Sequence, residues 1–368
     1  MLKRLISIIL VILVTCSSFT FASAQEITRK NDRNYYVETG YIPNDAIEYA
    51  QNSIGNMLMD QYDSNYIKLL YPFKLFNCEI DLYYFMVYFK DELVGSYRVF
   101  NLDGKYNGIF SEVDEFEKNI VTSFSQSTID YPAIVLCGQY NDVYSVVNDN
   151  VFTIIDDNEG NFTNTSYIKQ KSTEISEIKL ESSSKLLYTI NVKPYAMQRY
   201  MSSNYLQLDL KEIQGNDNNW CAAYCTASIV RFMKGLSLSQ CNAIVLMEWA
   251  YPGFPAIYLK DALFTNDNVI DYSKLKGLLP QIEGRRLSYT HVQWSIDKGT
   301  PILFGLTNDN MGTGHAVVCR GYNDNSANFY FSIWNPWYSV YEKIYEKDFQ
   351  YITKDGIIYT WTSTIHDF

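Results

Sequence analysis

The stretch that decides the fold is QGNDNNWCAAYCTASIVRFMKG, residues 214–235, which predicts a helix with a cysteine at its first position. The polar run Gly215–Trp220 supplies residues that cap helix N-termini, and Lys234-Gly235 is a favourable signal for the end of a helix. Cys221 then stands where unpaired backbone amides and the helix dipole favour an anion. We therefore expect the pKa of its thiol to fall below the ordinary value of about 8.5.

Only three histidines occur in the chain, which narrows the choice of a base for that thiol. His315 lies in MGTGHAVVCRGYN, at the mouth of a predicted strand, where Gly312 and Gly314 leave the imidazole approachable. His291, in the polar SYTHVQW, fits a surface or capping role better, and His366 is expected to fray with the chain end. His315 is therefore the expected base.

Two amide side chains complete the predicted site. Asn335, in WNPW, follows the next strand, so its carbonyl can accept the imidazole N–H while Trp337 shields that bond from water. Gln214 precedes the cysteine closely enough to form an oxyanion hole with the Cys221 N–H. Singly, a lone cysteine is more often a buried thiol and Asn-Pro more often a turn. The order Gln, Cys, His, Asn predicts acyl transfer.

Beyond residue 235 the sequence period changes from helix to strand. A further helix is predicted near Leu238–Trp249, and four short apolar or alternating runs then predict antiparallel strands. These runs are PILFGLTND, HAVVCRGYN, NFYFSIWNPW and GIIYTWTSTI. Helices followed by a sheet predict an α+β domain over residues 204–368, with a helical lobe and a sheet lobe.

Residues 25–203 predict a β-rich domain with one helix, over Asn44–Met59, where apolar residues recur at helical spacing. Two runs read as strand meanders, with turns at Asp103-Gly104, Asn141-Asp142 and Asn148-Asp149. The polar segment Asn158–Lys185 is expected to be irregular or to hold an edge strand.

This N-terminal domain contains no histidine and no phosphate-binding loop, which favours a structural or inhibitory role over a catalytic one. We expect the domain boundary and an activating cleavage within residues 193–212, because proteases cut exposed linkers.

The first 24 residues predict a secretory signal peptide. Lys3 and Arg4 precede an apolar run, Leu5–Val14, and Ala22-Ser23-Ala24 fits a cleavage site. The run is too short to span a membrane, which takes about 20 residues. Lipidation at Cys16 is the less favoured alternative, so we expect a free extracellular protein with no membrane partner.

Composition excludes several classes of protein. Hydrophobic residues make up 47% and charged residues 19%, with 32 tyrosines, which is typical of a folded chain rich in strands. The net charge of −11 excludes nucleic-acid binding of the usual phosphate-contacting kind. Cysteines are too sparse for a disulfide scaffold, and Cys78 with Cys137 is the one pair that we consider. We expect a monomer without metal or organic cofactor.

The motifs QGNDNNWCAAY, GHAVV and WNPW resemble the papain-like cysteine peptidases, most closely the staphopain family of secreted bacterial proteases. The resemblance covers residues 214–368. It implies a two-lobed papain fold and an N-terminal propeptide that inhibits the enzyme by blocking its cleft. In this chain the propeptide is matched to the family's half-barrel only by its size and strand content. The resemblance places four residues on the family's catalytic positions: Gln214, Cys221, His315 and Asn335. The expected function is a zymogen of a cysteine endopeptidase that acts on proteins or peptides.

Two departures from the family pattern and two alternatives remain. Ala222-Ala223 replaces the usual Ala-Gly, and Cys225 adds a thiol one helical turn after the nucleophile. Tyr251–Tyr258 and Met311–Thr313 are candidate linings of the specificity pocket.

A cell-wall amidase or endopeptidase, or a transglutaminase, could use the same lobes. A structural zinc site of Cys221, Cys225 and His315 would lack a clear fourth ligand.

Overall fold

The computed structural model describes residues 35–139, 142–155, 163–177, 185–193, 202–215, 218–308, 312–324, 329–346 and 349–368. The predicted signal peptide, Cys16, Asn141 and Met311 lie outside these residues. Among the described residues, no helix combines the length and apolar character needed to cross a membrane.

The N-terminal part begins with a helix packed on an antiparallel sheet. Helix α2, Asn44–Leu58, confirms the predicted helix, and its buried face packs on β5 and β6. The hairpin of these strands turns at Asp103 and Gly104, with φ of 53° and 80°, as the Asp-Gly signal predicts. The strands are β2 (Ile67–Leu70), β3 (Phe73–Lys74), β4 (Leu82–Phe89), β5 (Glu92–Leu102), β6 (Lys105–Glu112) and β11 (Thr189–Asn191), with a 3-10 turn at Ser64–Tyr66.

A second, three-stranded sheet lies beside the first. It follows the predicted meander, with Asn148 and Asp149 in the left-handed region that a tight hairpin requires. Two helices pack against it, of which α4 occupies the segment for which we expected irregular chain or an edge strand. The elements are β7 (Ile134–Cys137), β8 (Val143–Val147), β9 (Asn150–Ile155), α3 (Glu115–Phe124) and α4 (Thr165–Glu177), and a separate pair joins β1 (Tyr36–Val37) to β10 (Lys185–Leu186).

The C-terminal part combines helices with antiparallel strands, which confirms the predicted α+β class. Helix α5 begins at Cys221, as predicted, and α6 begins at Ala243, capped by Asn242. The helices are α5 (Cys221–Lys234), α6 (Ala243–Ala250), α7 (Asn266–Leu275) and α8 (Tyr289–Asp297), with a 3-10 turn at Ala256–Tyr258. The strands are β12 (Ser202–Tyr205), β13 (Gln281–Glu283), β14 (Ile302–Asn308), β15 (Thr313–Asp324), β16 (Phe329–Trp334), β17 (Tyr341–Tyr345), β18 (Gln350–Ile352) and β19 (Ile358–His366).

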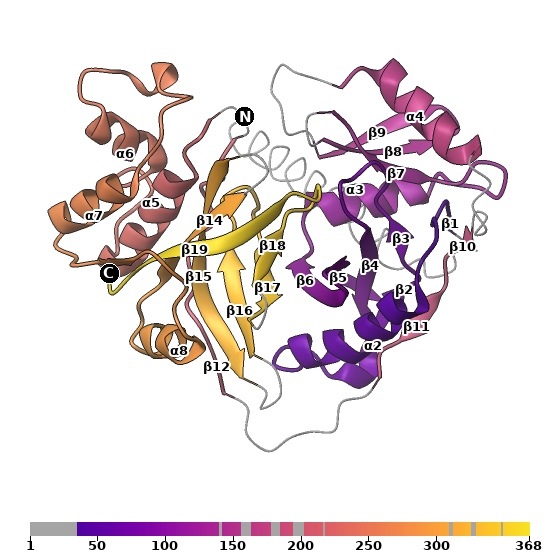
Figure 1. Cartoon of the computed structure of the whole chain (residues 1–368), viewed down its shortest axis with the longest axis horizontal. Helices are drawn as coiled ribbons and strands as arrows, with labels where there is room; N and C mark the ends of the chain where they lie inside the picture. Colours follow the sequence, from indigo (N-terminus) through magenta and orange to yellow (C-terminus); the bar gives the residue numbers. More distant parts are fainter. Residues whose placement is uncertain are drawn as a thin grey trace, which may run out of the picture.

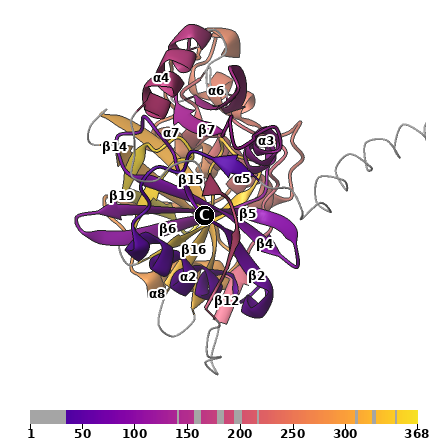
Figure 2. The ribbon, with the colours of Figure 1, turned by 90° about the vertical axis from the view of Figure 1, so that its right-hand side faces the viewer.

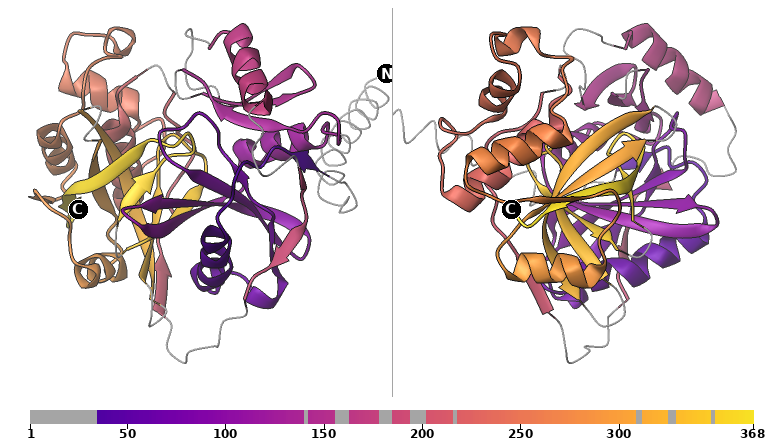
Figure 3. Two further views of the ribbon diagram at one scale, coloured as in Figure 1. Left: turned by 45° about the vertical axis from the view of Figure 1, so that its right-hand side comes forward. Right: turned by 60° about the vertical axis from the view of Figure 1, so that its left-hand side comes forward.

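The sheets of the two parts are continuous. Strand β17 pairs with β6, so one path runs β11-β2-β4-β5-β6-β17-β16-β15-β14-β19-β13. Figure 1 shows α5, α6 and α7 beside the C-terminal strands of this sheet, with the N-terminal strands at its other end. Figure 2 and Figure 3 show the strands of both parts fanned side by side. One buried cluster unites residues of both parts, such as Phe110 and Phe331, whereas α5, α6 and α7 enclose a second.

Strand β12 belongs to the C-terminal sheet by its contacts. It pairs with the far end of β15, with Tyr205 opposite Gly321. A side chain at Gly321 would come within 2.4 Å of the Tyr205 ring, so glycine is needed for the two strands to approach. The expected boundary between residues 203 and 204 thus falls inside a strand that is tied to the C-terminal part.

Candidate active site

Cys221 occupies the first position of α5, and the preceding loop fixes that start. The Trp220 indole N–H donates to the carbonyl of Leu259 at 2.7 Å, and the Asn219 N–H donates to the carbonyl of Lys260 at 2.9 Å. Trp220, the N-cap residue, makes no side-chain hydrogen bond to the first amides of the helix.

The expected low thiol pKa is not what this geometry favours. Burial raises the pKa of Cys221, and the backbone N–H groups of Ala316, Ala222 and Cys221 itself oppose that rise only in part. Because the Ala316 N–H is one of these groups, the Cys221 sulphur lies against the start of β15, next to His315. The start of helix α5 is therefore in contact with the start of strand β15.

His315 and Asn335 form a hydrogen bond, as predicted. His315 Nε2 lies 3.0 Å from Asn335 Oδ1, and the Trp337 N–H donates to the same oxygen at 3.0 Å. Because that oxygen accepts from both, His315 carries its proton on Nε2, which leaves Nδ1 for another partner. The Trp337 ring stacks on the imidazole at 3.8 Å and 19°. Burial lowers the pKa of His315 to about 4, although the bond to Asn335 opposes this.

Gln214 lies at the start of the loop that leads to Cys221. Its Nε2 donates to the carbonyl of Asn218 at 2.8 Å, and its backbone N–H donates to the carbonyl of Pro336 at 2.8 Å. The side chain is buried, and its Oε1 has no hydrogen-bond partner among the described residues. The bond to Asn218 uses one of the two protons of this amide nitrogen.

Cys225 packs against β15 rather than joining a metal site. It is fully buried, and its thiol donates to the carbonyl of Ala316 at 3.3 Å. Of the residues that the structure describes, the one group gathered like metal ligands is His291, His366 and Asp367. His366 is 2% exposed at the end of β19, so the expectation of a frayed histidine is wrong.

The candidate pocket segment near the site presents apolar side chains to solvent. Phe254, Ile257 and Tyr258 are 61%, 70% and 73% exposed, and the backbone contact of Lys260 with Asn219 ties them to the loop before Cys221. The other candidate segment, Met311–Thr313, is described only from Gly312 onward.

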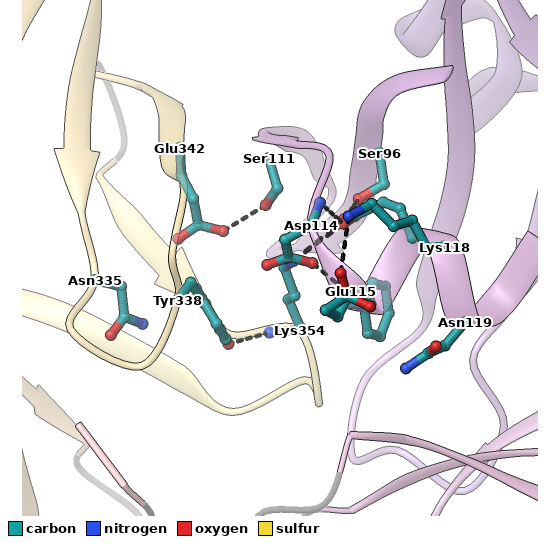
Figure 4. Close-up of polar contacts among 12 residues, drawn as sticks. Ser96, Ser111, Asp114, Glu115, Lys118, Asn119, Asn335, Tyr338, Glu342 and Lys354 are labelled. Atoms are coloured by element: carbon teal, nitrogen blue, oxygen red, sulfur yellow. Dashed lines mark hydrogen bonds and ion pairs between the residues drawn. The ribbon is translucent and has the colours of Figure 1, made fainter. Parts of the chain in front are cut away.

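Sequence reasoning missed the polar cluster behind Asn335. Figure 4 shows Glu342 facing Ser111 and Tyr338 pointing to Lys354, which lies beside Asp114 of the N-terminal part; Asn335 lies beyond Tyr338. The Lys354 ammonium is fully buried and contacts Asp114 at 2.8 Å and Glu117 at 3.3 Å. Because these partners lie more than 200 positions apart in the chain, no local pattern could identify them.

A thiol at a helix start beside an imidazole–amide pair is the arrangement of cysteine-type hydrolases. Residues 197–368 match the family model described as staphopain peptidase C47. Staphopain A of Staphylococcus aureus strain MRSA252 is 25% identical over 164 residues, and staphopain A of strain Mu50 / ATCC 700699 is 26% identical over 165 residues. Each alignment covers 43% of this chain and 42% of the relative, so the chain matches less than half of their length. The C-terminal part is thus similar to the staphopain peptidases, which confirms the resemblance seen in its motifs.

Proposed function

We propose that this protein is the precursor of a secreted cysteine endopeptidase that hydrolyses peptide bonds in proteins. The observation that carries the proposal is the 3.0 Å contact between His315 and Asn335 under the Trp337 ring, next to the helix that starts with Cys221. The match of residues 197–368 to staphopain peptidases supports the same chemistry.

The proposed reaction uses the four predicted residues. His315 Nδ1 takes the thiol proton, and the Cys221 sulphur attacks the scissile carbonyl carbon. The resulting oxyanion is held by the Cys221 N–H and the second amide proton of Gln214. His315, kept in orientation by Asn335, then passes the proton to the departing amine, and water hydrolyses the thioester.

The precursor is proposed to be latent. At neutral pH a raised thiol pKa and a lowered imidazole pKa leave Cys221 protonated and His315 neutral, whereas the reactive form is a thiolate beside an imidazolium. The N-terminal part, which adds strands to the β17 edge, is proposed to act as the inhibitory propeptide of a two-lobed papain-like domain. The protein is proposed to act as a monomer.

The pairing of β12 with β15 supports an activating cleavage upstream of Ser202 and downstream of β11, which ends at Asn191. Residues 1–24 are proposed to direct secretion and to be removed. The boundary at residues 203 and 204 is then a few residues beyond the bond that is cut.

The test compares the purified precursor with its Cys221→Ala variant under reducing conditions. Self-cleavage, digestion of casein and labelling by E-64 are followed together, and N-terminal sequencing of the product locates the cut. All three activities are expected in the parent chain and none in the variant.

Two outcomes would contradict the proposal. Labelling of Cys221 without any proteolysis would favour the amidase or transglutaminase alternative. Absence of both labelling and proteolysis after the N-terminal part has been removed would exclude a cysteine peptidase.

A further inference from the structure

A buried hydrogen-bonded path runs from the imidazole of His315 to the N-terminal domain. Beyond Asn335, whose Oδ1 faces His315, the Asn335 Nδ2 lies 2.6 Å from the Tyr351 hydroxyl. The Tyr351 hydroxyl in turn donates to Glu342 Oε2. The Ser111 hydroxyl donates to Glu342 Oε1 at 2.6 Å, which brings the path into strand β6. All of these side chains are at least 96% buried.

The direction of each proton along this path is determined. A tyrosine hydroxyl has one proton, and the Glu342 carboxylate takes it, so the Tyr351 oxygen must accept from the Asn335 amide. The amide nitrogen is thereby held toward Tyr351 and its oxygen toward His315. Trp337 reinforces the same orientation by donating to the oxygen. A flipped Asn335 would place two donors against each other at 3.0 Å.

The far end of the path is charged and belongs to the other domain. Arg98 of β5 forms an ion pair with Glu342 Oε1, and both side chains are fully buried. Glu342 lies opposite Ser111 in the β17–β6 pairing that joins the two sheets. Figure 4 shows Glu342 and Ser111 facing each other across that junction. The N-terminal domain therefore supplies the positive charge that balances the carboxylate.

We propose that Tyr351 and Glu342 are positioning residues for Asn335, and that Arg98 of the N-terminal domain tunes them for as long as that domain is docked. The proposal rests on the proposed function, because it assigns Asn335 to the imidazole of a catalytic pair. The Glu342 charge, passed through two hydrogen bonds, stabilises an imidazolium at His315. Arg98 offsets that charge in the precursor. Loss of Arg98 on processing then favours the thiolate–imidazolium pair.

The test measures how the alkylation rate of Cys221 depends on pH in the full-length chain. Iodoacetamide reacts with the thiolate, and mass spectrometry of the Cys221 peptide separates this thiol from the others. In Tyr351→Phe the acid limb of the profile is expected to move up by about one pH unit. Tyr341→Phe is the matched control, because its buried hydroxyl contacts the Leu208 backbone and lies outside the path. Its profile is expected to superimpose on that of the parent.

A second pair of variants tests the charge. Arg98→Met removes the offsetting cation and is expected to move the acid limb to lower pH, whereas Arg98→Lys keeps the charge and is expected to restore the parent profile. Circular dichroism checks that each variant is folded. Should Arg98→Met fail to fold, the Tyr351→Phe profile decides alone.

The outcomes separate this inference from the function on which it rests. If the parent chain is labelled by E-64 and digests casein, while the Tyr351→Phe profile superimposes on that of the parent, the positioning role alone is overturned. If the parent Cys221 reacted only as an ordinary thiol, both before and after removal of the N-terminal domain, the proposed function would fail as well.

An independent cluster at the end of β19 points to a metal site. His291 of α8, His366 of β19 and Asp367 offer ligand atoms that lie within 4.8 Å of one another. His366 is buried, yet neither of its ring nitrogens has a hydrogen-bond partner among the described residues; Nδ1 merely lies 3.2 Å from the Asp367 carboxylate. A buried imidazole without a hydrogen bond is costly, and a bound cation would satisfy it.

We also infer that these three residues bind Zn²⁺. Two imidazole nitrogens and one carboxylate form a donor set that suits zinc and leaves a fourth position to water. Ligand atoms around tetrahedral zinc stand about 3.4 Å apart, so the half-exposed His291 and Asp367 need only small rotations toward the buried ring.

Zinc stoichiometry is measured by equilibrium dialysis against ZnCl2 in a Cys221→Ala background, which removes the catalytic thiol as a competing ligand. One bound ion is expected to disappear in both His291→Ala and Asp367→Asn, and to persist in His315→Ala. Equal zinc content in all of these proteins, or none in the parent, would overturn the site.

Discussion

The buried ion pair between Arg98 and Glu342 gives the sharpest test of how the two parts are held together. Both side chains are fully buried, and two further guanidinium nitrogens of Arg98 have no partner in the described part of the chain. Replacing Arg98 by Met leaves Glu342 as a buried carboxylate without its counter-charge. We expect this to lower the free energy of unfolding by about 3–5 kcal/mol.

The double variant Arg98→Met, Glu342→Gln removes both charges but keeps an oxygen that can accept from Tyr351 and Ser111. Its stability is expected to return to within about 1 kcal/mol of the parent, because desolvation of the two charges no longer opposes folding. Lys118→Ala serves as the control. It breaks an exposed pair, Lys118 with Glu115, at 53% and 80% side-chain exposure, and should cost less than about 0.5 kcal/mol.

The assay is urea unfolding of the Cys221→Ala chain, followed by tyrosine and tryptophan fluorescence and by circular dichroism. Coincident transitions of the two signals would justify a two-state free energy. The reasoning is refuted if Arg98→Met costs no more than the Lys118 control, or if the double variant is as unstable as the sum of its single changes.

Three further predictions concern the site and the cysteines. Because burial holds the pKa of His315 at about 4, below its ordinary 6.5, the unfolded chain binds the extra proton between these values, and stability should rise with pH across that window. The imidazole resonances of His315 in the Cys221→Ala chain should titrate near 4. An imidazole that titrates at its ordinary pKa would contradict the buried geometry. Gln214→Ala should lower kcat of the processed enzyme about 100-fold with little change in KM, and an unchanged kcat would remove Gln214 from the oxyanion hole. The sulphurs of Cys78 and Cys137 lie 2.7 Å apart, so we expect a disulfide between them under oxidising conditions. The intact mass should then show the loss of two hydrogens, and Cys78→Ala should abolish this loss. A full set of free thiols in the oxidised protein would exclude the disulfide.

The sequence predicted those elements that depend on interactions between neighbouring residues. The helix that starts at Cys221 and the turn at Asp103-Gly104 depend on residues within one turn of each other, so their positions follow directly from the printed sequence. The contact between His315 and Asn335 was also predictable, because only one hairpin connection separates the strands that carry them.

Features that depend on distant residues could not be found this way. Helix α4 reads as a polar, Ser- and Thr-rich segment because it buries only Ile168, Ser172 and Ile175. The role of Glu342 depends on Arg98, which lies 244 positions earlier. The thiol pKa of Cys221 was misjudged for the same reason: the helix dipole is visible in the sequence, whereas the burial that outweighs it is produced by β15.

The charges that join the two parts also explain how they could separate without aggregation. On the proposed activation, β17 becomes the edge of its sheet once β6 leaves, and an open edge invites pairing with other chains. Strand β17 carries Glu342 and Lys343, which in this structure form ion pairs with Arg98 and Asp60 of the N-terminal part. An inward-facing carboxylate on a short edge strand opposes edge-to-edge pairing. The same residues can therefore hold the precursor together and keep the processed enzyme soluble.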